Sequence, residues 1–181
     1  MKLDLPDVAA TERLGAALVA ALGKVTGGSP QGWLILLQGE LGSGKSTLAR
    51  SMLRAYGHKG AVPSPTYTLV EPYSFSGFSL YHIDLYRIGS ATELDFLGWP
   101  DLDDGLRLVE WPERVPGLAE QADIEIALHY AGNGRRADVS ALSGRGSELV
   151  AALSRSPVAA PHSRVPDEPP PAGAPPGASS G

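Results

Sequence analysis

Cysteine is absent from the 181-residue sequence, which removes two classes of stabilising site at once. Without it, neither a disulfide framework nor a thiolate metal site can form. The histidines lie too far apart along the chain to suggest a local zinc motif; they are His58, His82, His129 and His162. A structural metal is therefore not expected.

Long apolar runs are also missing. Residues 33–37 and the alanine-rich residues 16–22 are both far shorter than the roughly 20 residues that a helix needs to cross a bilayer. The second run is preceded by Asp4, Asp7 and Glu12, where a secretory signal would carry positive charge. We expect a cytoplasmic protein without a membrane partner.

Positive charge is in short supply, with 15 lysines and arginines against 20 acidic residues and a formal net charge of −5. Proteins that hold nucleic acid by neutralising many phosphates normally present a basic face. We therefore expect no DNA partner, and any RNA would be held mostly by another protein. With 43% hydrophobic and 19% charged residues, the composition is that of a soluble globular chain long enough to bury a core.

The last segment, residues 156–181, has almost no large side chains to bury and is rich in proline and alanine. Such a composition predicts a disordered tail. No aromatic or basic pattern accompanies the prolines, so an inert extension is favoured over a proline-rich docking motif. Residues 1–155 are expected to form one domain.

Within that domain, the first half alternates strand-like and helix-like segments. Residues 1–5 predict a short edge strand, and residues 11–22 predict an amphipathic helix with leucines at helical spacing. Residues 33–38 are continuously apolar, which is typical of a buried strand in a parallel sheet. A glycine-rich loop and a helix over residues 45–56 follow. Prolines at positions 63, 65 and 72 predict an irregular loop over residues 61–77.

The second half continues with short elements. We expect strands at residues 78–85, 106–110, 124–130 and 136–142, a short helix at 92–97 and a closing helix at 147–153. Gly132, Asn133 and Gly134 suit a hairpin turn between the last two strands.

A phosphate-binding loop lies between the buried strand and the helix that follows it. The sequence fits G-x4-G-K-[ST], in the segment Gly39, Glu40, Leu41, Gly42, Ser43, Gly44, Lys45 and Ser46, with Thr47 next. Backbone N–H groups of such a loop point at phosphate oxygens, and the helix dipole adds positive potential. Lys45 is expected to reach the β- and γ-phosphates, and Ser46 to place its hydroxyl on Mg²⁺. The fold class predicted is α/β: a P-loop NTPase-like three-layer sandwich with a mostly parallel central sheet and an antiparallel extension.

Two acidic residues close predicted strands and are candidates to orient the metal or the attacking water: Asp84 and Glu110. The sequence alone does not rank them. No [NT]-K-x-D element follows the loop, which favours adenine over guanine and hence ATP. Trp111, beside Glu110, is expected to pack against the nucleotide, a partner or the core.

Four blocks of sequence go beyond a general phosphate loop. They are residues 39–47 (GELGSGKST), 64–70 (SPTYTLV), 81–87 (YHIDLYR) and 109–113 (VEWPE). In this order they resemble the TsaE (YjeE) family, whose loop reads G-[DE]-L-G-[AS]-G-K-[ST]-T. In that family the second block is a switch loop and the last two are acidic strand ends. The resemblance extends over about residues 8–153, and Ser46 stands where many relatives have threonine.

The resemblance implies roles for individual residues. Lys45, Ser46 and Thr47 would bind phosphate and Mg²⁺, Asp84 would support hydrolysis, and Glu110 would be the metal partner, direct or through water. It also implies nucleotide contacts from Thr11 and Arg135, and places Thr66 and Thr68 on a loop that responds to the γ-phosphate.

The family resemblance further implies a cytoplasmic ATPase, weak by itself, that works with the TsaB and TsaD proteins. Their product is the threonylcarbamoyl (t6A) modification of the tRNA adenosine next to the anticodon, and tRNA would be contacted indirectly through the complex. A different hypothesis is an interaction module in which ATP binding regulates assembly and hydrolysis is incidental. A small-molecule kinase also fits the loop. Such an enzyme would need an acceptor pocket and an arginine-bearing lid, and no sequence pattern indicates either.

Overall fold

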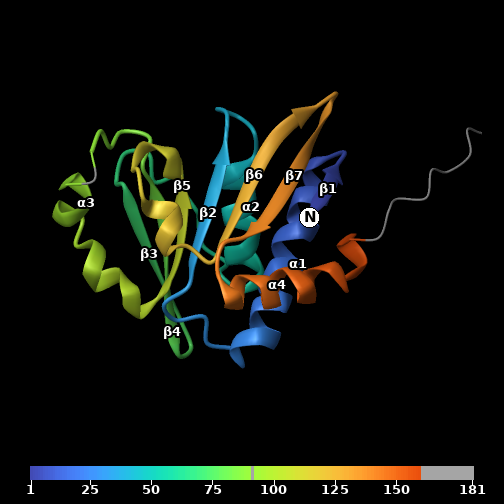
Figure 1. The fold of residues 1–181 in the computed structure, drawn as a ribbon, viewed down its shortest axis with the longest axis horizontal. Coiled ribbons are helices and arrows are strands. Elements are labelled where there is room, and N and C mark those ends of the chain that lie inside the picture. The colour runs from blue at the N-terminus through green and yellow to red at the C-terminus, as the bar shows by residue number, and fades with distance from the viewer. Residues whose placement is uncertain (91, 160–181) are drawn as a thin grey trace, which may run out of the picture.

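The computed structural model describes residues 1–90 and 92–159. Within these residues, seven strands form one sheet in the order β1-β7-β6-β2-β5-β4-β3 (Figure 1). The strands are β1 (Lys2–Leu5), β2 (Leu34–Gly39), β3 (Val70–Phe75), β4 (Phe78–Asp84), β5 (Leu106–Glu110), β6 (Ile124–Ala131) and β7 (Gly134–Ala141). The α-helices are α1 (Val8–Thr26), α2 (Lys45–Ala55), α3 (Thr92–Phe96) and α4 (Gly144–Ser154), and short 3₁₀ turns are η1 (Trp99–Asp104), η2 (Pro112–Arg114), η3 (Leu118–Gln121) and η4 (Pro157–Ala159).

The four central strands, β6, β2, β5 and β4, run parallel to one another. Antiparallel pairs flank them on both sides: β6 with β7 and β7 with β1 at one end, and β4 with β3 at the other. The predicted antiparallel extension is therefore present. Parallel order is confined to the centre, so the sheet as a whole is mixed rather than mostly parallel.

The predicted irregular loop over residues 61–77 is wrong in its second half, because residues 70–75 form β3. Pro72 pairs with Tyr81 in the register of β3 and β4. Proline is accepted in a sheet at an edge strand, where its missing N–H breaks no ladder bond, and β3 is the last strand of this sheet. Only the part before Val70 stays irregular.

Helices cover the two faces of the sheet unequally. Side chains of α1, α2 and α4 form one core cluster with Ile35 and Leu37 of β2. Leu34 and Leu36 of β2 point to the opposite face and join a second cluster with α3 and the 3₁₀ turns. Burial on both faces explains why residues 34–37 of β2 are all apolar.

Helix α1 is longer than predicted and begins at a side-chain cap. Asp7 Oδ1 accepts a hydrogen bond from Ala10 N at 2.7 Å, and Gly27 ends the helix with a left-handed backbone (φ 65°). These are common signals for starting and stopping a helix. Further along α1, a Cβ at Gly15 would overlap the Ser51 side chain, so glycine is what allows α1 and α2 to pack closely.

The predicted tail, residues 156–181, lies outside the described residues from position 160 onward, and its first part holds the short turn η4. Its disorder and the domain division remain predictions. In the part of the chain that is described, no helix has the length and apolar character needed to span a membrane.

Candidate nucleotide site

The phosphate loop connects the end of β2 to the start of α2, as the motif requires. Three of its glycines have positive φ: 141° at Gly39, 76° at Gly42 and 110° at Gly44. Gly39 cannot be replaced without a clash, because a Cβ there would lie 2.4 Å from the Leu128 carbonyl oxygen. Gly44 is the residue before α2, so the N-terminus of that helix lies at the end of the loop and faces the site.

Lys45 is held inside the loop that precedes it. Its ammonium donates to the carbonyl oxygens of Gly39 at 2.7 Å and Glu40 at 3.0 Å, and lies 3.8 Å from the centre of the Trp111 ring. Burial lowers the pKa of Lys45, and the negative charges of Glu110, Glu113 and Asp84 oppose that shift. The cation thus sits at the centre of the loop, among carbonyl dipoles and three carboxylates.

Glu110 is the last residue of β5, and its side chain contacts the first turn of α2. One of its oxygens, Oε2, accepts from the Ser46 hydroxyl at 2.9 Å, and the other, Oε1, lies 2.7 Å from Nε2 of His82. The side chain is only 3% exposed. A hydroxyl and a carboxylate in contact provide hard oxygen ligands of the kind that Mg²⁺ prefers, so the residues present fit a magnesium site.

Asp84 lies at the end of β4, in register with Glu110 on the neighbouring strand. Its Oδ2 accepts from the Thr66 hydroxyl and its Oδ1 from the Tyr86 amide, both at 2.8 Å. Thr66 belongs to the loop between α2 and β3, and the same loop is tied to Asp84 a second time because Asp84 N donates to the Leu69 carbonyl. The two carboxylates therefore sit side by side, but they contact different parts of the chain.

The structure brings most of the predicted site residues into one small cavity of about 190 Å³. Its lining contains Lys45, Ser46 and Thr47 with Leu41, Gly42 and Gly44 of the loop, and Ser64, Thr66, Asp84, Glu110 and Trp111 opposite them. Thr68, which was placed on the same loop, is exposed and is not part of this lining.

Thr11 and Arg135 lie on the other side of the loop. Together with Thr47, Gly42, Ser43 and Gly44, they line a second cavity of about 390 Å³. Arg135 donates to the Gly42 carbonyl at 3.1 Å, and its guanidinium lies 4.1 Å from the centre of the Tyr130 ring. The β6–β7 hairpin thus supports the phosphate loop from outside.

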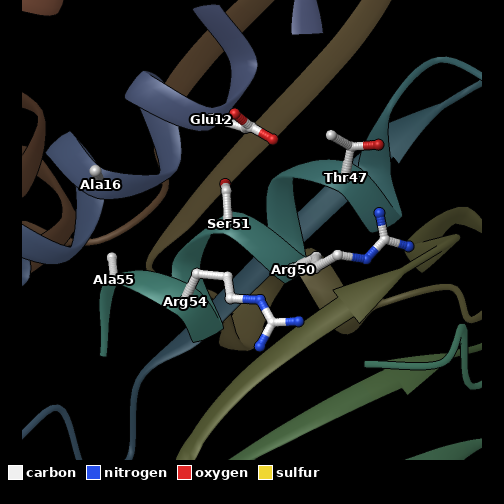
Figure 2. A pocket seen from close by; sticks show the side chains of 7 residues that line it. All are labelled: Glu12, Ala16, Thr47, Arg50, Ser51, Arg54 and Ala55. Carbon is white, nitrogen blue, oxygen red and sulfur yellow. The ribbon is translucent and has the colours of Figure 1, made fainter. Parts of the chain in front are cut away.

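A third cavity, of about 420 Å³, opens between α1 and α2 (Figure 2). Glu12 borders it on α1, and Arg50 and Arg54 extend from successive turns of α2. Thr47 lines all three cavities, so the first turn of α2 is where they adjoin.

Two residues at the site were not assigned a role from the sequence. Tyr130 donates to the Leu41 carbonyl at 2.7 Å and so fixes the tip of the loop, although 89 positions separate the two residues. His82 precedes Asp84 by two residues, and residues i and i+2 of a strand share a face. That alternation was a signal that His82 points toward the carboxylates.

The site can be compared with known proteins. The model of a family described as "Threonylcarbamoyl adenosine biosynthesis protein TsaE" matches residues 5–137, which include the loop, both acidic strand ends and Arg135. A Haemophilus influenzae protein named tRNA threonylcarbamoyladenosine biosynthesis protein TsaE is 42% identical over 123 residues, covering 67% of this chain and 78% of that protein.

Two further comparisons extend over more of the chain. A Nostoc sp. protein of the same name is 33% identical over 156 residues, covering 83% of this chain and 91% of that protein. The crystal structure of Bacillus subtilis YdiB superposes with a TM-score of 0.66 at 25% identity, covering 86% of this chain and 94% of that one. The likeness therefore includes the sheet and the helices around it.

Proposed function

The chain belongs to the TsaE family, and from that premise we propose that it is a Mg²⁺-dependent ATPase subunit required for threonylcarbamoyl modification of tRNA. The adenosine modified would be the one next to the anticodon, and the chain would act in the cytoplasm with the TsaB–TsaD pair. The observation that carries the proposal is the hydrogen bond from Ser46 to Glu110 next to the phosphate loop. In the same loop, the Lys45 ammonium bonds to the Gly39 carbonyl.

ATP binding is supported by the loop and by the two cavities around it. The β- and γ-phosphates would meet the N-terminus of α2 and the Lys45 ammonium, which would exchange its bonds to Gly39 and Glu40 for phosphate oxygens. Thr11 and Arg135 would contact the rest of the nucleotide, since they line the cavity on the other side of the loop. The same strand–loop–helix unit supports the P-loop NTPase-like assignment of the fold.

Metal binding is supported by the donor set. Ser46 and Glu110 would hold Mg²⁺, which neutralises charge on the phosphates during transfer. The contact with Ser46 favours Glu110 over Asp84 as the metal partner, because no hydrogen bond joins Asp84 to the hydroxyl among the described residues. Asp84 would then position the attacking water from the neighbouring strand.

An interaction module is the second candidate, and one observation favours it. Thr66 and the Leu69 carbonyl tie the loop before β3 to Asp84, so a change at the nucleotide would reach a loop on which Tyr67 is 87% exposed. Under this hypothesis ATP binding sets the shape of a docking surface, and hydrolysis is incidental.

The experiment that decides is Mg²⁺-dependent ATP hydrolysis by the full chain, with and without its TsaB–TsaD pair, with GTP as the nucleotide control. We expect ATP-selective turnover that changes on adding the pair and vanishes in Lys45→Ala. ATP binding without any turnover, even with the pair and tRNA present, would leave only the interaction module.

A further inference from the structure

His82 is a polar residue inside the core of the site, and only 1% of its side-chain surface is exposed. Its Nε2 lies 2.7 Å from Oε1 of Glu110. A carboxylate only accepts hydrogen bonds, so Nε2 carries the proton and donates it. We propose that His82 is a positioning residue that fixes the Glu110 carboxylate, so that its other oxygen faces Ser46 and the metal position. This inference rests on the proposed function.

Within residues 1–90 and 92–159, Glu110 is the one hydrogen-bond partner of the His82 ring. Among the described residues Nδ1 has no partner, and with the proton on Nε2 it is an acceptor only. The other neutral tautomer would leave a buried N–H unpaired and set two acceptors against each other at 2.7 Å. If the ring merely filled volume, leucine would do so without burying an unpaired polar atom. The bond to Glu110 therefore explains why a polar ring occupies this buried position.

Glu110 has reason to need this support because its two oxygens have separate partners. Oε2 accepts from Ser46, whose hydroxyl oxygen keeps its lone pairs free for a metal while it donates. The bond from His82 to Oε1 is separate from the Ser46 bond, since His82 lies on β4 and Ser46 on α2. His82 thus keeps the carboxylate in one orientation whether or not Ser46 still donates to it.

Some residues do not bind the metal but donate a hydrogen bond to one of its ligands. Removing such a residue typically lowers metal affinity or activity by about 10- to 100-fold. That range sets the size of the effect to look for. It would be seen in the part of nucleotide affinity that depends on Mg²⁺, and not in the part that depends on the loop alone.

The test places two amide side chains of different length, glutamine and asparagine, at position 82. The side-chain nitrogen of glutamine is as many bonds from Cα as Nε2 of histidine, so His82→Gln keeps a donor for Glu110. The nitrogen of asparagine corresponds to Nδ1, so His82→Asn stays polar but falls short. His82→Leu removes the donor entirely, and His129→Gln, at an exposed position on β6, is the matched control.

Each full-length variant is titrated with a non-hydrolysable ATP analogue by calorimetry, once with Mg²⁺ and once with EDTA, and its thermal unfolding is recorded. We expect Kd with Mg²⁺ to rise about 10- to 100-fold in His82→Leu and His82→Asn, and to stay within about 3-fold in His82→Gln and His129→Gln. Kd in EDTA should change little in any of them. In a Glu110→Gln background, His82→Leu should have no further effect on the Mg²⁺ dependence.

Several outcomes would overturn the inference. It fails if folded His82→Leu and His82→Asn keep the wild-type Mg²⁺ dependence, or if His82→Gln loses as much as His82→Asn, because the donor is then irrelevant. Should His82→Leu not fold, the comparison of the two amides decides alone. A wild-type chain whose affinity is indifferent to Mg²⁺ would refute the proposed function itself, and the inference with it.

Discussion

Asp84 and Glu110 occupy equivalent positions at the ends of adjacent parallel strands, and both are almost fully buried, yet their surroundings differ. Glu110 is held by side chains of β4 and α2, two regular elements packed in the core. Asp84 is held by Thr66 and by the amide of Tyr86, both outside regular elements. Equal placement in a sheet therefore does not give the two carboxylates the same kind of partners.

The difference suggests a division between a fixed carboxylate and a coupled one. Bonds from packed elements keep Glu110 in one orientation, which suits a metal partner that must be ready before the nucleotide arrives. Bonds from an irregular loop make Asp84 sensitive to the position of that loop, which suits a residue that completes the site on nucleotide binding. Changing each carboxylate separately tests this division.

Replacing Asp84 with asparagine is expected to have the largest effect on turnover. Asparagine keeps the shape, but it has one acceptor oxygen for the two donors that now bond to Asp84, and it cannot take a proton or orient water as a carboxylate does. We expect kcat to fall by about 10²- to 10⁴-fold while Kd for Mg²⁺-ATP stays within about 3-fold. Single-turnover hydrolysis and calorimetry measure the two quantities, and a Kd that rises in step with the loss of kcat would reverse the roles of the two carboxylates.

Replacing Glu110 with glutamine is expected to act mainly through the metal. The Mg²⁺ concentration that gives half-maximal hydrolysis should rise by at least about 10-fold, because one charged oxygen ligand is lost. High Mg²⁺ should restore part of the rate, which it should not do for the asparagine variant at position 84. If neither variant responds to Mg²⁺ concentration, the distinction between the two sites disappears.

The sequence predicted the elements around the site better than the contacts inside it. Local patterns predicted the strand–loop–helix unit and both acidic strand ends. A buried strand, a glycine loop and a helix can each be recognised from a short run of consecutive residues. Strand β3 was missed because Pro72 reads as a breaker, and only the sheet order shows that it lies at an edge.

At the level of sequence, only the family resemblance implied separate roles for the two carboxylates. A ranking from their contacts was beyond the sequence for a similar reason. It depends on the hydrogen bond from Ser46 to Glu110, which joins residues 64 positions apart. The bonds from Tyr130 to Leu41 and from His82 to Glu110 also join residues far apart in the sequence, 89 and 28 positions respectively. Local patterns place side chains on a face of an element, but which side chains then meet depends on how the elements pack.

The smallest effect is expected at Thr66, where the comparison of fixed and coupled carboxylates is tested most directly. Valine has nearly the same shape as threonine but lacks the hydroxyl that donates to Asp84 at 2.8 Å. Loss of one such bond is worth about 1 kcal/mol, so we expect kcat to fall by about 5-fold in Thr66→Val. The Mg²⁺ concentration for half-maximal hydrolysis should not change, because Glu110 keeps both of its partners.

The matched control for that variant is Thr26→Val, the same chemical change in the last residue of α1. Within the described part of the chain, the Thr26 hydroxyl bonds only to the Leu22 carbonyl one turn earlier. The control should leave kcat and the Mg²⁺ dependence as they are. An unchanged kcat in Thr66→Val would mean that the loop does not act through Asp84, whereas a shifted Mg²⁺ dependence would mean that the loop also reaches Glu110. Either result would remove the contrast between the two carboxylates, since the contrast requires that the loop influence one of them and not the other.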